Sequence, residues 1–287
     1  MPYALLAIAC VLLLAGCGES RSSSSPAPEP SPAATLPAPD ARLPADAGAL
    51  VGALAATTRD LDAAIDRWLR DGDPARGGPP QDVELLALHQ QRIYRLLGDR
   101  PALYPRVLAA LPRALRAEAR DNVLARRELG QIKSVRRGPP PRISIGHAEP
   151  AGVLLGHYRR AWRRFHVDWE VLAAVNFVES AFGRLRNRSI SGARGPMQFM
   201  PATWAVYGLG GDISDPRDAI MGAANYLHQS GAPADEAGAL HHYNPSDEYV
   251  SAIRRYIRRI RADRRAFYAY YAWAVYVGGE RRTDPGR

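Results

Sequence analysis

The sequence has few cysteines and no motif typical of a metal or nucleotide site. Only two of its 287 residues are cysteine, Cys10 and Cys17. No zinc-type spacing of Cys and His and no glycine-rich phosphate loop occurs. His241 and His242 are adjacent, so their side chains point apart, and no third ligand follows at a useful spacing. The sequence therefore predicts neither a metal nor a cofactor.

Lysine is almost absent, and arginine provides nearly all of the positive charge. Lys133 is the only lysine, and the formal net charge is +9. An arginine bias is also what a GC-rich genome would give. A positive surface favours an anionic partner such as nucleic acid, acidic lipid or cell-wall polymer. Nucleic-acid binding has no second support in the sequence, so we expect no nucleic-acid partner.

The alternation of apolar and polar residues that marks strands is nearly absent. A hydrophobic fraction of 46% and five tryptophans indicate a globular chain. From residue 45 onward apolar residues recur at helical spacing. Helices are expected over residues 50–71, 81–97, 112–129, 150–165, 168–182, 215–230 and 246–261. Asp215-Pro216 and Ser246 are typical helix starts, with a capping side chain before the first turn. The sequence predicts an all-α fold.

The N-terminus indicates the compartment. Ala4 to Ala15 is an unbroken apolar run of signal-peptide length, too short to span a bilayer comfortably. It ends in Leu14-Ala15-Gly16-Cys17, which resembles the lipobox of bacterial lipoproteins. The resemblance implies that Cys17 is lipidated and anchors the chain to the outer face of the cell membrane, or that the protein is secreted if the lipobox is not used. One departure is that residues 1–3 contain no Lys or Arg, which puts the assigned start codon in question. The alternative is a buried N-terminal helix with a chance cysteine.

Composition divides the chain into segments. Ser, Pro and Ala dominate after Cys17, which predicts a disordered tether. A Gly-Pro-Pro-Pro run then separates two helical regions. The predicted organisation is a signal peptide (1–17), a tether (18–44), an N-terminal helical region (45–137), a linker (138–149), a second helical domain (150–277) and a flexible tail (278–287). Nothing in the N-terminal helical region argues for chemistry, so a scaffold or spacer is expected there.

One glutamate stands apart in the second helical domain. Glu179 falls on the same helical face as Leu172, Val175 and Phe182. No other carboxylate occurs from Ser180 through Gly211. Burial beside apolar groups would raise the pKa of Glu179, and a carboxyl that is still protonated near neutrality can act as a general acid. The alternative is a surface glutamate near a helix end.

The residues around Glu179 resemble the soluble lytic transglycosylase family of peptidoglycan-cleaving enzymes. The matching motifs are, in order, Glu179-Ser180, Ser189, Gly192-Ala193, Gly195-Pro196-Met197-Gln198-Phe199-Met200-Pro201, Tyr243-Asn244 and Tyr249-Val250. The resemblance covers about residues 150–261. The Gly-Pro-Met-Gln-Phe-Met-Pro variant and Gly211-Asp212-Ile213 look like an actinobacterial branch of that family.

The resemblance implies a lysozyme-like helical domain with a sugar-binding groove. Glu179 would be the catalytic residue, cleaving the bond between N-acetylmuramic acid and N-acetylglucosamine and leaving 1,6-anhydro ends. Tyr249 would hold the glutamate by a phenolic hydrogen bond. The groove residues expected to bind substrate are Ser189, Gln198, Met200, Tyr243, Asn244 and Tyr249. An ordinary core role for Met200 is equally open. Peptidoglycan glycan strands are the expected partner.

Two departures and two rival functions accompany this prediction. Pro245-Ser246 stands where the family usually has Ala-Gly, and the spacing from Glu179 to Ser189 differs by a residue from many relatives. The first rival is a hydrolase similar to goose-type lysozyme, and the second is a non-catalytic wall-binding lipoprotein. The arginines of residues 254–261 are expected to be solvated, and the aromatic run 267–276 is expected to pack under the domain, with a sugar platform as its alternative.

Overall fold

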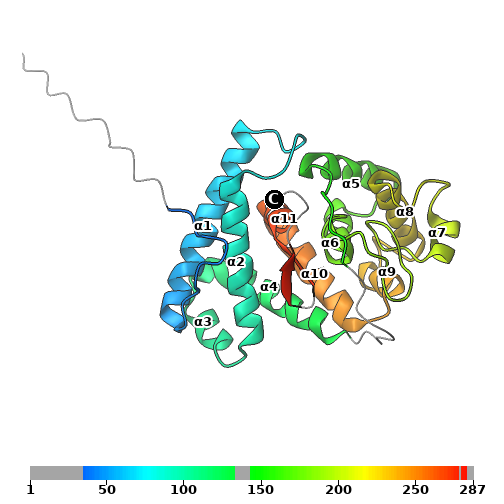
Figure 1. Ribbon diagram of the computed structural model, residues 1–287. Coiled ribbons are helices and arrows are strands. Elements are labelled where there is room, and N and C mark those ends of the chain that lie inside the picture. The colour runs from blue at the N-terminus through cyan, green and yellow to red at the C-terminus, as the bar shows by residue number, and fades with distance from the viewer. Residues whose placement is uncertain (1–34, 133–142, 278, 283–287) are drawn as a thin grey trace, which may run out of the picture. The chain divides into compact units, whose positions relative to one another are not determined.

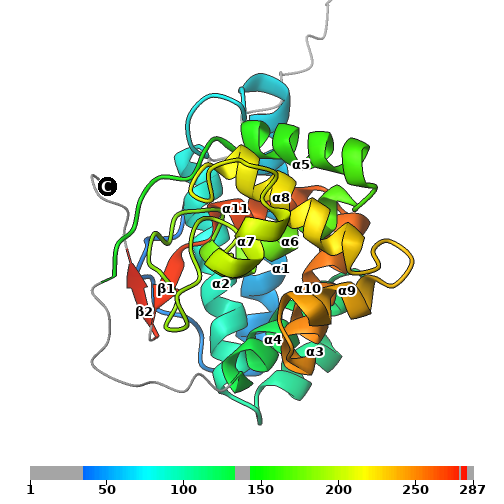
Figure 2. The ribbon, with the colours of Figure 1, turned by 90° about the vertical axis from the view of Figure 1, so that its right-hand side faces the viewer.

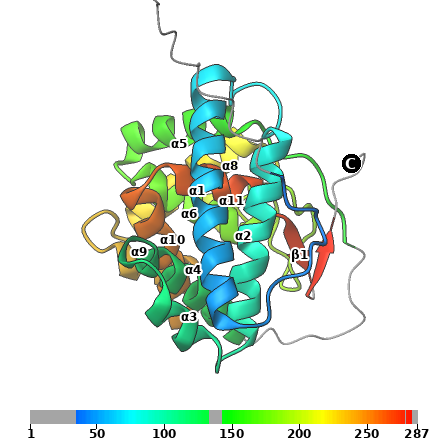
Figure 3. The ribbon, with the colours of Figure 1, turned by 90° about the vertical axis from the view of Figure 1, so that its left-hand side faces the viewer.

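Long amphipathic helices build the N-terminal part of this computed structural model, which describes residues 35–132, 143–277 and 279–282. α1 (Ala47–Asp71) begins at Asp46, whose carboxylate accepts a hydrogen bond from the backbone N–H of Ala49. Its buried residues recur at helical spacing and pack against α2 (Gln81–Asp99), which runs alongside it in Figures 1 and 3. α3 (Tyr104–Ala110) and α4 (Arg113–Gln131) complete this part. The described residues from Leu36 onward form one compact unit.

Shorter helices and a small hairpin build the remainder. The helices are α5 (Ala151–Phe165), α6 (Trp169–Ser180), α7 (Pro201–Tyr207), α8 (Pro216–Gln229), α9 (Glu236–Tyr243), α10 (Asp247–Ala262) and α11 (Arg265–Ala272). β1 (Val275–Val277) pairs antiparallel with β2 (Glu280–Arg282), as Figure 2 shows. The described residues thus confirm the predicted all-α class, and the hairpin is the one sheet among them.

Helix boundaries follow the predicted caps with two differences. Asp215 and Ser246 cap α8 and α10 by accepting from backbone N–H groups, as expected. The helix predicted from residue 168 begins at Trp169, and the carboxylate of Asp168 accepts a hydrogen bond from Arg261 without capping the helix. α6 ends at Ser180 rather than continuing to Phe182, because the next residues take left-handed backbone angles that a helix does not admit.

The linker and tail ranges are partly described. Ser144 and Gly146 exchange backbone hydrogen bonds with residues 184 and 186, so this end of the predicted linker is tied to the segment after α6. Residues 280–282 form strand β2 within the range for which a flexible tail was predicted. Residues 1–34, which include the predicted signal peptide and most of the predicted tether, lie outside the described residues.

The arginines of α10 pack against α4 instead of facing solvent alone. Arg255 donates to both carboxylate oxygens of Glu128 at 2.8–2.9 Å and to Asp121 at 3.3 Å. Arg258 adds a 3.0 Å bond to Asp121, which is 1% exposed. The expectation of a solvated arginine face was therefore wrong for this part of α10. Buried acids on α4 demand cationic partners, and α10 supplies them.

The aromatic run 267–276 packs inside the unit, as expected. Phe267, Tyr268, Tyr270, Tyr271 and Trp273 are all buried. Tyr270 and Trp273 meet with ring centroids 4.8 Å apart, at an edge-to-face angle.

Among the described residues, no helix has the length and apolar character needed to cross a membrane.

Candidate active site

Glu179 lies in the last turn of α6, just before an unusual reversal of the chain. Ala181, Phe182 and Gly183 have φ values of 51°, 64° and 82°, three left-handed residues in succession. Two of these are not glycine, and each such residue costs of order 1 kcal/mol that the surrounding structure must offset. Phe182 is 2% exposed, so its packing holds the reversal in place. The helix therefore stops directly after Glu179 and Ser180.

The Glu179 carboxyl is held in a protonatable state. Burial raises its pKa to about 7, and a hydrogen bond from Tyr249 opposes that rise. The Tyr249 hydroxyl donates to Oε1 of Glu179 at 2.7 Å, as the resemblance implied. Burial and the charge of Glu179 raise the pKa of Tyr249 well above its usual value, so its hydroxyl keeps its proton. Near neutral pH the carboxyl can therefore both give and take a proton.

Among the described residues, no second carboxylate contributes to the pKa of Glu179. Its shift has two causes, burial and the Tyr249 hydrogen bond, and neither is another acid. Asp212 and Asp215 instead bind backbone N–H groups at the start of α8. This geometry differs from glycosidases in which two carboxyl groups flank the bond that is cleaved.

Two buried polar residues on α6 fix the loop that faces Glu179. Asn176 is fully buried, accepts from Tyr158 at 2.9 Å and donates to the Pro196 carbonyl at 3.0 Å and to the sulfur of Met197. Ser180 donates to the same Pro196 carbonyl and accepts from the N–H of Gly183 at 2.8 Å. One carbonyl thus joins both sides of Glu179 to the loop.

The loop itself needs glycine at its turn. Arg194 and Phe199 form an antiparallel bridge with two 2.9 Å backbone hydrogen bonds. Gly195 begins the turn between them with φ of 75°, and a Cβ there would collide with the carbonyl oxygen of Ile213. The close approach of Ile213 and the left-handed backbone therefore both require glycine at this position.

Three predicted groove residues lie on or beside this loop. Ser189 Oγ accepts from the N–H of Ala193 and lies 3.0 Å from Ser191 Oγ. Gln198, at φ of 50°, donates to the carbonyl of Gly195 at 2.9 Å. Met200 is 42% exposed, which excludes the alternative of an ordinary core methionine. Ser189 and Gln198 thus spend part of their hydrogen-bonding capacity on the loop.

The remaining two predicted groove residues lie at the end of α9. Tyr243 donates to the carbonyl of Met197 at 2.6 Å, which ties α9 to the same loop. Burial raises the pKa of Tyr243 well above its usual value, and the charge of Glu179 adds to this rise. Asn244 ends α9 with its backbone N–H bonded to Leu240 and is partly buried. Tyr243 therefore positions the loop, a role that sequence reasoning did not assign.

Sequence reasoning also missed Asn176 and the role of Ser180. A polar residue three positions before Glu179 inside an apolar run was the available signal for Asn176. Its partners on the loop come from sequence positions 20 and more residues away.

Cys17, the predicted lipidation site, lies outside the described residues. Among those that are described, no group of three or more His, Cys, Asp or Glu could hold a metal ion.

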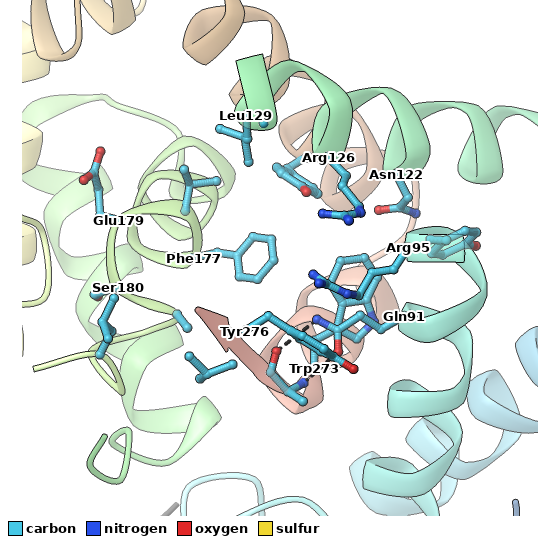
Figure 4. Close-up of a pocket in the computed structure, with 18 of the residues that line it drawn as sticks. Gln91, Arg95, Asn122, Arg126, Leu129, Phe177, Glu179, Ser180, Trp273 and Tyr276 are labelled. Atoms are coloured by element: carbon cyan, nitrogen blue, oxygen red, sulfur yellow. Dashed lines mark hydrogen bonds between the residues drawn. The ribbon is translucent and has the colours of Figure 1, made fainter. Parts of the chain in front are cut away.

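A cavity of about 570 Å³ lies beside α6. The C-terminal end of α6 and the residues that follow it line this cavity together with α2, α4, Tyr256 of α10 and the segment from Trp273 to Gly279. In Figure 4 the Glu179 carboxylate does not point toward the arginines of this cavity. Glu179 and Ser180 also line the cavity, so it shares the C-terminal end of α6 with the loop of residues 194–199 that Asn176 and Ser180 bind.

Residues 157–261 match the family model described as Transglycosylase SLT domain. This range contains Glu179, the glycine-bearing loop and Tyr249. Comparison with curated proteins and with solved structures finds no match for the chain.

Proposed function

The chain contains a transglycosylase SLT domain at residues 157–261, and on this basis we propose that it cleaves peptidoglycan strands with formation of 1,6-anhydro-N-acetylmuramic ends. Lytic transglycosylases of this family act on peptidoglycan. The observation on which the proposal rests is the partly buried carboxyl of Glu179, which has a pKa of about 7 and accepts a hydrogen bond from Tyr249.

In the proposed reaction Glu179 acts twice. Its protonated carboxyl gives its proton to the glycosidic oxygen between N-acetylmuramic acid and N-acetylglucosamine as the bond to C1 breaks. The resulting carboxylate then takes the proton from the C6 hydroxyl of the same muramic residue, and O6 bonds to C1. The carboxyl regains its proton and no water is consumed. A pKa near 7 suits both steps because the two protonation states are close in free energy.

Tyr249 has a positioning role in this proposal. Its hydroxyl holds Oε1, which leaves the other carboxyl oxygen for the proton transfer. Ser189, Gln198, Met200 and Asn244 are proposed to contact the sugars, because the first three lie on the loop tied to both sides of Glu179. Amide and hydroxyl groups suit the acetamido and hydroxyl groups of such a substrate.

The test is product analysis by mass spectrometry after incubation of the full chain with purified sacculi. Anhydro-muramic ends from the parent, and none from Glu179→Gln, are expected. Reducing ends heavier by one water would establish a hydrolase instead. If neither protein releases fragments while both pellet with sacculi, the chain is a wall-binding protein and the proposal is wrong.

We also propose that Cys17 is acylated and anchors the chain to the outer face of the cell membrane. The support is the lipobox-like sequence Leu14-Ala15-Gly16-Cys17 after an apolar run. Two or more acyl chains hold a protein stably on a membrane. Cys17→Ala is expected to move the protein from the membrane pellet to the supernatant on fractionation. Equal pelleting of both proteins would contradict the anchor.

A further inference from the structure

The cavity beside α6 joins parts of the chain that lie outside the matched domain. Gln91 closes one wall by bonding Ala274 twice, through its amide nitrogen at 3.0 Å and its amide oxygen at 2.9 Å, as Figure 4 draws. Arg95 stacks on the ring of Tyr276, with its guanidinium carbon 3.6 Å from the ring centroid. The volume of about 570 Å³ is in the range of small-ligand and peptide pockets.

Two buried polar groups of this cavity have no hydrogen-bond partner among the described residues, and both are donors. Trp273 is 5% exposed, and its indole N–H has no acceptor there. The Nε of Arg126 is buried without an acceptor as well. The amide groups of Gln91 and Asn122, by contrast, are occupied by other residues. Because buried donors without acceptors are costly, the cavity is built for a ligand that brings acceptors.

The charge of the cavity points to an anion. Arg95 and Arg126 both line it, and Glu179 is the one acid among the described lining residues. Asp99 accepts from Arg126 at 2.6 Å, so it neutralises one of the two guanidinium groups. Arg95 makes a 3.5 Å bond to the Gly279 carbonyl. Burial and, after it, the charge of Arg126 lower the pKa of Arg95.

We propose that this cavity binds an acidic peptide, the carboxylate-bearing peptide stem of the glycan strand on which Glu179 acts. The guanidinium of Arg95 pairs with a stem carboxylate, and Trp273 donates to a stem carbonyl or carboxylate. Phe177, Tyr256 and Tyr276 receive the aliphatic parts of the peptide. The choice of this peptide rests on the proposed function, since a substrate at Glu179 brings its stem to the same helix.

A peptide stem is long enough to run from a sugar at Glu179 into this cavity, which Glu179 itself lines. An α-helix with its side chains is about 10 Å across. An extended peptide of four residues spans about 13 Å. A stem attached to a sugar at the Glu179 carboxyl is therefore long enough to pass the C-terminal end of α6, where the chain turns away at Ala181. The N-terminal helices would then select substrate instead of serving as a spacer.

The experiment measures binding without cleavage. Full-length Glu179→Gln is titrated in a calorimeter with a free acidic stem peptide and with the same peptide after amidation of its carboxylates. The acidic form is expected to bind. Amidation is expected to weaken binding about tenfold or more, because charge-assisted hydrogen bonds are lost. Arg95→Gln on the same background is expected to weaken binding by a similar factor, and Arg95→Lys by less, since lysine keeps the charge without the planar fork.

Arg120→Gln is the matched control. Arg120 is an exposed arginine of α4 outside the cavity, so its replacement should leave binding unchanged. Absence of peptide binding, equal binding by Arg95→Gln, or stronger binding of acidic lipid vesicles than of the peptide would each overturn the proposal. Cleavage of sacculi by the parent is assayed separately. Peptide binding by a chain that cleaves nothing would therefore refute the proposed function and leave the peptide site standing.

Discussion

The N-terminal helices α1–α4 and the SLT segment, residues 157–261, differ in helix length and in how many residues have strained backbone angles. α1, α2 and α4 contain 25, 19 and 19 residues, whereas α6, α7 and α9 contain 12, 7 and 8. The non-glycine residues at positive φ are His166, Ala181, Phe182, Gln198 and Leu209. Within the described residues, all of them lie in the SLT segment and none lies in α1–α4.

This difference separates scaffold from site. Regular helices reach their packing through a repeated apolar face, so each residue sits in its preferred backbone region. The SLT segment has unfavourable backbone angles directly after Glu179 and Ser180 and within the loop that carries Gln198. Strain of this kind is retained only where hydrogen bonds and packing over-determine it, which here are the bonds of Asn176, Ser180 and Tyr243 to residues 196–197.

The largest loss of stability is expected when the hydrogen bonds of Asn176 in the SLT segment are removed. Asn176→Leu keeps the volume but leaves the Tyr158 hydroxyl buried without its acceptor and frees one bond of the Pro196 carbonyl. We expect a loss of about 4 kcal/mol in the free energy of unfolding, measured by urea titration. Tyr158→Phe removes only the first bond and should cost about 1 kcal/mol. Equal losses would mean that the loop does not depend on Asn176.

The next effect concerns the contact between the two regions. Arg255→Met would leave Glu128 without its cationic partner and Asp121, which is 1% exposed, with less positive charge around it. We expect a loss of about 3 kcal/mol, since breaking one side of a buried ion pair leaves a charge uncompensated. Arg254→Met is the control on the same helix, because its arginine is 53% exposed and 4.0 Å from Glu236. Equal melting temperatures for the two variants would show that α4 and α10 are held by apolar packing alone.

A comparable change in the free energy of unfolding, but one that depends on pH, is expected when Glu179 is replaced by glutamine, its neutral analogue. Because the folded-state pKa of about 7 exceeds the unfolded value of about 4.3, the proton binds the folded state more tightly. The parent therefore loses stability as the pH rises from about 4.5 through 7. Glu179→Gln, which has no charge to bury, should be more stable than the parent by about 3 kcal/mol at pH 8 and equal to it below pH 4. A difference that is constant from pH 4 to pH 8 would show that Glu179 does not titrate in this range.

The smallest effect refines the role of Tyr249. The hydrogen bond of Tyr249 lowers the pKa of Glu179 against the effect of burial, so Tyr249→Phe should raise that pKa further. The alkaline limb of the rate profile on sacculi should then move to higher pH, and the maximum rate should fall about tenfold because one positioning bond is lost. A lower rate with an unmoved limb would assign Tyr249 to substrate binding alone.

The sequence predicted those features of the fold and site that depend on local pattern. The helical spacing of Leu172, Val175 and Glu179 placed the glutamate on a buried face, and Asp215 and Ser246 marked helix starts. The bond between Tyr249 and Glu179 was predicted from the family resemblance and spans 70 positions.

Features that depend on tertiary partners were not predictable in the same way. Nothing in the spacing of α10 indicates that Arg255 meets Glu128 rather than solvent. The reversal after Ser180 has glycine only at its third position, so its left-handed start at Ala181 has no sequence mark. The cavity is formed by residues from five separate stretches of sequence, in and around α2, α4, α6, α10 and β1, and none of these stretches indicates it on its own.

The left-handed turn at Ala181 has a consequence for engineering this protein. Glycine at this position would accept φ of 51° without the penalty that alanine bears, so stability-guided sequence design will favour Ala181→Gly. The same change would widen the range of backbone angles open to the chain two residues after Glu179. Selection for stability is thus expected to favour glycine at position 181, whereas selection for catalytic rate is expected to keep alanine there.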